Sequence, residues 1–131
     1  MTDEKQLEVL RNNFRKAVGC YRKKLFEKND YGLCFTFNRL SINKIGCFKS
    51  VNKSIQNGFS AEEHFKAAEN IRELFDCSVL IEQHYKKKTY RCERHNLCVS
   101  KIKAGYFAYL NVVTWGNNEG YIDLYLSREA E

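Results

Sequence analysis

Residues 105–127 read GYFAYLNVVTWGNNEGYIDLYLS, and this stretch decides the fold. Two segments rich in β-branched and aromatic residues flank the turn-forming sequence GNNEG, a pattern that predicts an antiparallel hairpin. Apolar residues alternate with polar or aromatic ones in its second strand, so the two sets face opposite sides of the sheet. The first set is Ile122, Leu124 and Leu126, and the second is Tyr121, Asp123, Tyr125 and Ser127.

Two segments upstream of this hairpin are strand-like as well. They are SVLIE (78–82) and LCVSKI (97–102), and the polar sequence HYKKK (84–88) between them predicts a turn. The C-terminal half of the chain therefore predicts an antiparallel sheet of about four strands.

The N-terminal half shows helical periodicity instead. Apolar residues recur at spacings of three and four from Thr2 to about Lys28, which predicts one long amphipathic helix, and LCFTF (33–37) predicts a short strand. Ser50 is expected to cap a short helix that Asn57 and Gly58 close.

A further helix is predicted directly after this one. Ser60 and Glu63 have the spacing of a capping box, and the apolar pattern that follows continues through Phe75. Helices followed by an antiparallel sheet predict an α+β fold with one long and two short-to-medium helices, in a single domain of residues 1–131.

Composition and the missing motifs limit the classes of protein to which this chain can belong. The chain of 131 residues begins with the charged MTDEKQ and has no apolar stretch long enough for a membrane span, so we expect a soluble, cytoplasmic protein without a membrane partner. The six cysteines are interpreted as reduced core residues. A Gly-rich phosphate loop, a G-x-S-x-G elbow and an H-E-x-x-H motif are all missing from the sequence, which argues against the enzyme classes that use them.

Positive charge is concentrated in one segment. Residues 83–105 contain seven cations against Glu93 alone, which equals the net charge of +6 of the whole chain. Tyrosines lie among these cations, as expected of a single-stranded RNA site, although a solvated loop explains the charge equally well. The cations are Lys86, Lys87, Lys88, Arg91, Arg94, Lys101 and Lys103, and the tyrosines are Tyr85, Tyr90 and Tyr106.

The sequence KSIQNGFSAEEH (53–64) raises a choice between structure and chemistry. The capping box and the glycine explain most of it as helix punctuation. Lys53, Ser54 and His64 need a separate account. His64 is either a buried histidine satisfied by a backbone carbonyl or a neutral imidazole at a helix N-terminus, where it could accept a proton beside a bound phosphate.

Cys92, His95 and Cys98 form a Cys-x-x-His-x-x-Cys sequence, which invites a zinc interpretation. Zinc would need a fourth ligand such as His84 or Cys77, and the paired Cys-x-x-Cys knuckle is missing. We therefore favour a loop between strands and expect no metal.

The stretch from Ser50 to Leu80 resembles the third of the large polyvalent-protein-associated domains of phages and conjugative elements. The resemblance extends over roughly residues 40–128 and leaves residues 1–30, the predicted N-terminal helix, outside it. The matching residues are Lys53, Ser54, Asn57, Gly58, Phe59, Ser60, His64, Ala68, Ile71, Leu74 and Phe75.

The predicted arrangement of helices followed by a four-stranded antiparallel sheet is in turn similar to the barnase, EndoU, colicin and RelE group of metal-independent ribonucleases. This similarity implies a toxin-like RNA-cleaving domain. One departure stands out. Where this group suggests a cation on the penultimate strand, the chain has Thr114 and Trp115.

Two hypotheses follow. The first is a metal-independent endoribonuclease-like domain of a mobile element that acts in a bacterial or phage-infected cell without a cofactor. Its predicted catalytic residues are His64, His95 and Lys53, and its predicted RNA contacts are Ser54, Arg91, Arg94, Lys86, Lys87, Lys88 and Tyr125. The second is a non-catalytic module that binds nucleic acid or protein through the basic segment. An inhibitor or a host protein is a further expected partner.

Overall fold

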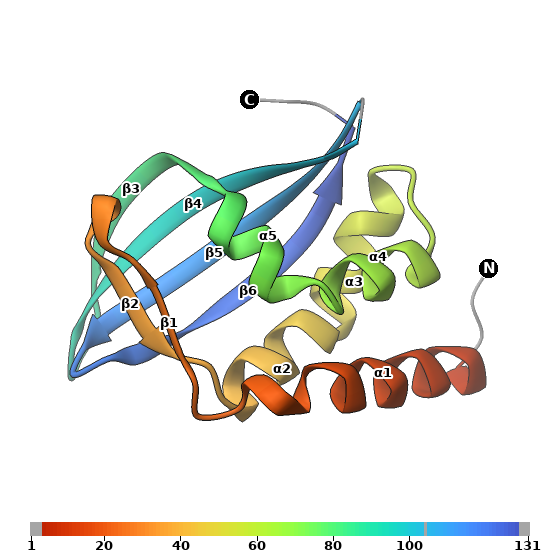
Figure 1. Ribbon diagram of the computed structural model, residues 1–131, viewed down its shortest axis with the longest axis horizontal. Helices are drawn as coiled ribbons and strands as arrows, with labels where there is room; N and C mark the ends of the chain where they lie inside the picture. Colours follow the sequence, from red (N-terminus) through yellow and green to blue (C-terminus); the bar gives the residue numbers. More distant parts are fainter. Residues whose placement is uncertain (1–3, 104, 129–131) are drawn as a thin grey trace.

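The computed structural model describes residues 4–103 and 105–128. Its four-stranded antiparallel sheet has the order β3-β4-β5-β6, and a separate two-stranded hairpin is formed by β1 and β2 (Figure 1). The α+β prediction is confirmed. The helices are α1 (Glu4–Val18), α2 (Arg39–Gly46), α3 (Phe48–Gln56), α4 (Ala61–Ala68) and α5 (Ile71–Cys77). The strands are β1 (Leu25–Lys28), β2 (Leu33–Thr36), β3 (Val79–Lys87), β4 (Cys92–Lys103), β5 (Tyr106–Gly116) and β6 (Glu119–Ser127).

The hairpin of β5 and β6 forms as the sequence predicts. Asn117 and Asn118 both adopt the left-handed conformation that a two-residue turn requires. Gly120 follows at a close approach, because a Cβ at this position would collide with the carbonyl oxygen of Val113. The predicted alternation holds, since Ile122, Leu124 and Leu126 are buried, whereas Asp123 and Tyr125 between them are partly exposed.

The N-terminal helix is shorter than predicted. It ends at Val18, a 3-10 turn spans Gly19–Tyr21, and residues 25–28 form β1 rather than a further turn of helix. Phe26 explains the difference, because it is fully buried while Leu25, which fits the helical stripe, is 40% exposed. Burial in this segment follows the period of a strand, and Phe26 packs on Phe35 of the partner strand β2.

Helix α2 is an element that sequence reasoning missed. Its N-terminus is capped by Asn38, whose side chain accepts a hydrogen bond from the amide of Leu40. The next helix, α3, begins at Phe48, so Ser50 lies inside it and is not its cap. The Ser50 hydroxyl instead contacts the Lys44 carbonyl and the Asp123 carboxylate. The predicted closure after α3 is present, with Gly58 at a φ of 95°.

The capping box at the start of α4 is confirmed in both directions. The Ser60 hydroxyl accepts the amide of Glu63, and the Glu63 carboxylate accepts the amide of Ser60. The helix predicted to continue to Phe75 is divided, however. Glu69 and Asn70 form a turn between α4 and α5 that redirects the second helix across the sheet.

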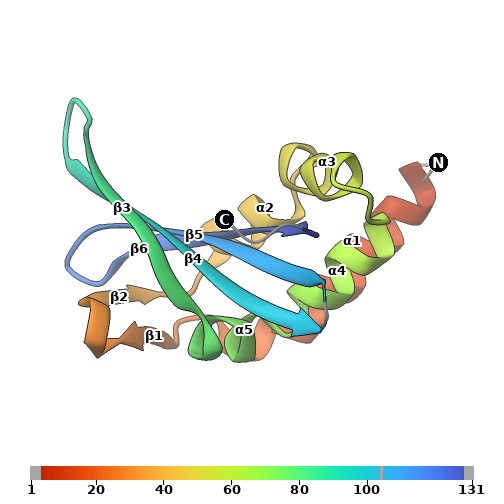
Figure 2. The same ribbon diagram turned by 90° about the horizontal axis from the view of Figure 1, so that it is seen from above.

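Within the described part of the chain, no helix lies across one face of the sheet. Helix α5 and the β1–β2 hairpin cover the opposite face of the sheet (Figure 2). Helices α4 and α1 pack against each other next to them (Figure 2). Helices α2 and α3 run beside β6, and on the other side the β3–β4 hairpin rises away from the rest of the sheet (Figure 2). The core between the covered face and the helices is rich in phenylalanine, including Phe14, Phe26, Phe35, Phe37, Phe65 and Phe75.

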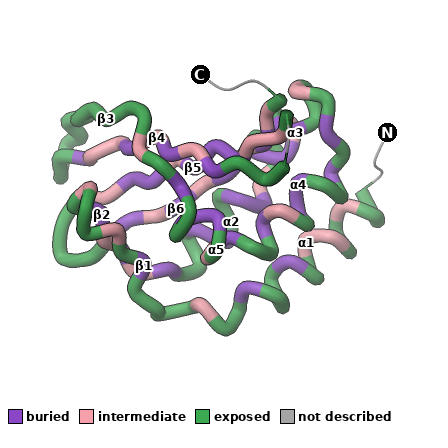
Figure 3. The backbone as a smooth tube through the Cα atoms, turned by 45° about the horizontal axis from the view of Figure 1, so that its top comes forward, coloured by how far each residue is buried: buried purple, intermediate pink, exposed green. Residues whose placement is uncertain are grey.

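The two edge strands of the sheet, β6 and β3, differ in how far other elements cover them. Along β6, the amides of Ile122 and Leu126 donate to the hydroxyls of Ser41 in α2 and Ser54 in α3. Serines therefore satisfy an edge that would otherwise leave buried donors unpaired. Strand β3 is exposed along almost its whole length (Figure 3). Among the described residues, no helix is long and apolar enough to cross a membrane.

Candidate active site

The uncovered side of the sheet, here called the open face, carries polar and aromatic side chains. Cross-strand register places His95 of β4 beside His84 of β3 and Val113 of β5, and Val113 beside Tyr121 of β6. The next row contains Asp123, and the one after it contains Tyr125. The open face includes His84, Glu93, His95, Leu97, Val99, Tyr109, Asn111, Val113, Trp115, Tyr121, Asp123 and Tyr125.

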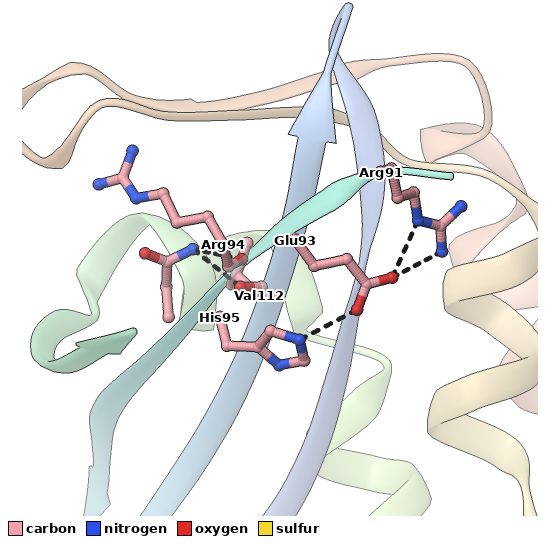
Figure 4. A network of polar contacts seen from close by, with 6 residues as sticks. Arg91, Glu93, Arg94, His95 and Val112 are labelled. Atoms are coloured by element: carbon pink, nitrogen blue, oxygen red, sulfur yellow. Dashed lines mark hydrogen bonds and ion pairs between the residues drawn. The ribbon is translucent and has the colours of Figure 1, made fainter. Parts of the chain in front are cut away.

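A chain of charged groups lies at one end of the open face. The Nε and one terminal nitrogen of Arg91 donate to the same oxygen of Glu93, at 2.9 and 2.7 Å, and His95 Nε2 donates to the other oxygen at 3.0 Å (Figure 4). Exposure increases outward from the carboxylate, from 6% for Glu93 to 24% for His95 and 43% for Arg91. Glu93 is thus the buried centre of a network whose other members reach solvent.

The carboxylate of Glu93 stays ionised in this setting. Burial by itself raises the pKa of Glu93, but hydrogen bonds from Arg91 and His95, together with the charges of Arg91 and Lys88, outweigh it. The pKa of Glu93 therefore lies below its usual range.

The hydrogen bond to Glu93 also places a proton on Nε2 of His95. A carboxylate can only accept, so Nε2 carries a proton, and in the neutral tautomer that makes this bond the lone pair lies on Nδ1. No hydrogen bond from the described residues engages Nδ1. His84 stacks on His95 with ring centroids 5.2 Å apart and planes 13° from parallel. Two imidazoles thus stand side by side on neighbouring strands.

A hollow of about 520 Å³ opens next to Glu93. Its wall includes Tyr121, whose phenol stays protonated because burial, followed by the charges of Glu93 and Asp123, raises its pKa. The hollow brings together cations from separate parts of the chain, namely Lys44 of α2 and the hairpin residues Lys88 and Arg91. Such a site is suited to an anion with a planar group.

Trp115 on the penultimate strand carries a cation on its ring. The guanidinium of Arg91 lies 3.6 Å from the ring centroid of Trp115, and Trp115 in turn contacts Tyr121. The aromatic residue at this position therefore holds a cation that comes from the β3–β4 hairpin.

His64 and Ser54 lie in the core, away from the open face. His64 is fully buried, with Nε2 2.9 Å from the Ile45 carbonyl and Nδ1 2.8 Å from the Ser54 hydroxyl. Because a carbonyl only accepts, Nε2 carries the proton and Ser54 donates to Nδ1 while accepting from Leu126. Burial lowers the pKa of His64 to about 4. This placement supports the structural interpretation of both residues and removes them from the candidate site.

The remaining predicted site residues divide between the two faces. Arg94 points away from Glu93 and His95 (Figure 4) and donates to the carbonyls of Tyr31 and Gly32, so it fastens the β1–β2 hairpin rather than a phosphate. Lys53 does face the open side, with Nζ 4.1 Å from the ring centroid of Tyr125. The three lysines Lys86, Lys87 and Lys88 are exposed at the tip of the β3–β4 hairpin.

The zinc interpretation meets a geometric obstacle. Side chains alternate along β4, so Cys92 and Cys98 project to the face opposite His95 and cannot share an ion with it. Within residues 4–103 and 105–128, no group of three potential ligands lies close enough to hold a metal. All six cysteines are free, but only Cys98 is buried, so the prediction that they are core residues is wrong for the other five.

Sequence reasoning did not assign Glu93, His84 or Tyr121 to the ribonuclease site, although it named His84 as a possible zinc ligand. A signal was present, because Arg91, Glu93 and His95 alternate with the period of a strand and so share one face. No protein-family model matches the chain, and neither the curated proteins nor the solved structures contain a match to it.

Proposed function

We propose that this protein is a metal-independent endoribonuclease whose active site is the cluster of Arg91, Glu93, His95 and His84 on the open face. The observation that carries the proposal is the hydrogen bond from His95 Nε2 to a buried, ionised Glu93. It orients the imidazole and leaves Nδ1 to accept a proton, as a carboxylate does for histidine bases in general.

The reaction that fits these groups is attack of a ribose 2′-hydroxyl on the adjacent phosphorus. His95 Nδ1 takes the 2′-hydroxyl proton while the 2′-oxygen forms its bond to phosphorus. The bond from phosphorus to the 5′-oxygen breaks, and protonated His84, stacked 5.2 Å away, supplies the proton that this leaving oxygen needs. The products are a 2′,3′-cyclic phosphate and a 5′-hydroxyl.

Charge on the phosphate oxygens is met by the cations of the hollow. Arg91 uses two of its nitrogens on Glu93, so its third nitrogen remains to bind the phosphate. Lys44 and Lys88 line the same hollow. A hydrogen-bond donor that is held in place before the reaction stabilises the transition state by on the order of 3 kcal/mol in known enzymes.

A second candidate function is a module that binds RNA without cutting it. The observation in its favour is that Arg91 and His95 already satisfy both oxygens of Glu93, so the network is also complete as a structural element. The cations of the open face would then serve affinity alone.

A cleavage assay with end-group analysis separates the two. The purified protein is incubated with a defined RNA in EDTA, beside Glu93→Gln and the control Glu62→Gln, which changes an exposed glutamate of α4. The nuclease predicts 2′,3′-cyclic phosphate ends from the wild type and the control and a loss of at least about 100-fold in Glu93→Gln. Binding of RNA by all three proteins with no new ends would refute the nuclease and leave the binding module.

The relation to polyvalent-protein-associated domains and to the barnase, EndoU, colicin and RelE group is part of the proposal. It is supported by the helices that precede a four-stranded antiparallel sheet and by a polar cluster on the uncovered side of that sheet. With it comes the proposal that the chain acts for a mobile element in the cytoplasm and meets an inhibitor or a host protein.

A further inference from the structure

The rim of the open face formed by α2 and α3 carries a line of lysines, Lys44, Lys49 and Lys53, here called the lysine row. Lys44 Nζ lies 4.9 Å from the ring centroid of Tyr121, and Lys53 Nζ lies 4.1 Å from that of Tyr125. Lys49 is four residues before Lys53 and so shares its side of α3. All three are exposed, although the tyrosines beneath two of them hold the ammonium groups in place.

The two tyrosines beneath the lysine row, Tyr121 and Tyr125, bind ammonium groups, and their rings are largely occupied by neighbouring side chains rather than open for a base to stack on. Tyr125 stacks on Tyr109 with centroids 5.2 Å apart, and Lys53 lies over the ring as well. Tyr121 is similarly placed between Trp115 and Lys44. Ammonium groups fixed in this way lose little further side-chain freedom when a phosphate binds.

The Asp123 carboxylate beside the row already accepts two hydrogen bonds. Asp123 lies between Tyr121 and Tyr125 on β6, and it accepts from the Ser50 hydroxyl and the Leu124 amide. Burial raises the pKa of Asp123 above its usual range, although Ser50, Leu124, Lys44 and Lys49 favour its charged form. Asp123 is only partly exposed, whereas Lys44, Lys49 and Lys53 are exposed.

The row continues from the proposed active site. Lys44 lines the hollow that also contains Arg91 and Glu93, and Lys53 lies further along β6. From Tyr121 to Tyr125 the strand rises about 13 Å, at ~3.3 Å per residue. A stacked single strand covers that span with about four nucleotides at ~3.4 Å each, and an extended strand with fewer.

We infer that the lysine row is a phosphate-binding track that holds a single strand of RNA on one side of the hollow. This inference rests on the proposed function, because it extends the same site. A single strand is the fitting form, since a nucleotide must leave its stack to reach Glu93, which is 6% exposed and lines the hollow together with Lys44 of α2 and Lys88 of the β3–β4 hairpin.

The test measures binding with a probe that the protein cannot cut. A fluorescent 2′-O-methyl RNA hexamer lacks the attacking hydroxyl, so its anisotropy reports affinity even from an active nuclease. Affinity is measured against salt concentration for the wild type, for Lys44→Gln, for Lys53→Gln and for the control Lys16→Gln, an exposed lysine on α1.

Each row variant is expected to reduce the slope of log affinity against log salt by about 0.7, the value for one contact to a single strand. The double variant should lose about twice that and the control nothing. A dimer probe is too short to reach from the hollow to Lys53, so it should bind the wild type and Lys53→Gln alike. Equal slopes for row variants and control, or equal affinity of the wild type for the hexamer and its duplex, would overturn the inference.

The outcome is independent of whether the protein cuts RNA. If the slopes fall as expected and the cleavage assay finds no cyclic phosphate, the track stands and the nuclease fails. If cleavage is found and the slopes are unchanged, the nuclease stands and the track fails.

Discussion

Lowering the pH should destabilise this protein through His64 more than through any exposed histidine. The ring is fully buried, and its pKa of about 4 in the folded state lies below the ordinary 6.5 expected once the chain unfolds. The unfolded state therefore binds a proton that the folded state refuses. The stabilising contribution is complete above about pH 6.5 and is lost as the pH falls towards about 4.

The difference in pKa sets the size of the effect. A shift of this extent corresponds to about 3 kcal/mol in full and to about 2 kcal/mol at pH 5. That is a large share of the stability of a small domain, which is about 5 to 15 kcal/mol.

Urea denaturation of the wild type and of His64→Gln at pH 7 and pH 5 measures how much stability is lost through His64 as the pH falls. Glutamine keeps a donor and an acceptor but does not titrate, so its free energy of unfolding should fall about 2 kcal/mol less than that of the wild type over this range. Carboxylates such as Asp123 titrate in both proteins and cancel in the comparison. His84→Gln is the matched control at an exposed position. Parallel profiles for wild type and His64→Gln would refute the assignment of a buried, neutral histidine.

Two further changes test the fold, each by urea denaturation. Arg94→Ala should lower the free energy of unfolding by about 2 kcal/mol, because it removes charged hydrogen bonds to the carbonyls of Tyr31 and Gly32. An unchanged stability would show that these hydrogen bonds contribute nothing. Gly120→Ala should cost about 1 to 3 kcal/mol, since its methyl group meets the Val113 carbonyl, whereas Gly19→Ala, with open space around it, should be close to neutral. Equal effects of the two glycine substitutions would contradict the close approach of β5 and β6.

The parts of the fold that sequence predicted are those set by local periodicity. The β5–β6 hairpin follows from alternation on either side of GNNEG, and the capping box of α4 follows from the spacing of Ser60 and Glu63. The end of α1 did not follow, because Leu25 continues the helical stripe and only the burial of Phe26 against Phe35 decides for a strand. That contact depends on tertiary packing.

The candidate site was partly predictable for the same reason. His95 and Arg91 were singled out from the sequence, but His84 fell in a segment predicted to be a turn. Strand β3 in fact continues to Lys87, and its register is what brings His84 opposite His95. The role of His64 was open between core and catalysis until its contacts with Ser54 and Ile45 placed it in the core.

The most direct test of the account compares two histidine substitutions in one cleavage assay. A defined RNA is incubated in EDTA with wild type, His95→Ala and His64→Gln at equal concentrations of folded protein, with cyclic phosphate ends as the readout. The account predicts that His95→Ala loses at least about 100-fold in rate and still binds RNA, and that His64→Gln cuts at the wild-type rate. Full activity in His95→Ala, or a folded but inactive His64→Gln, would contradict it.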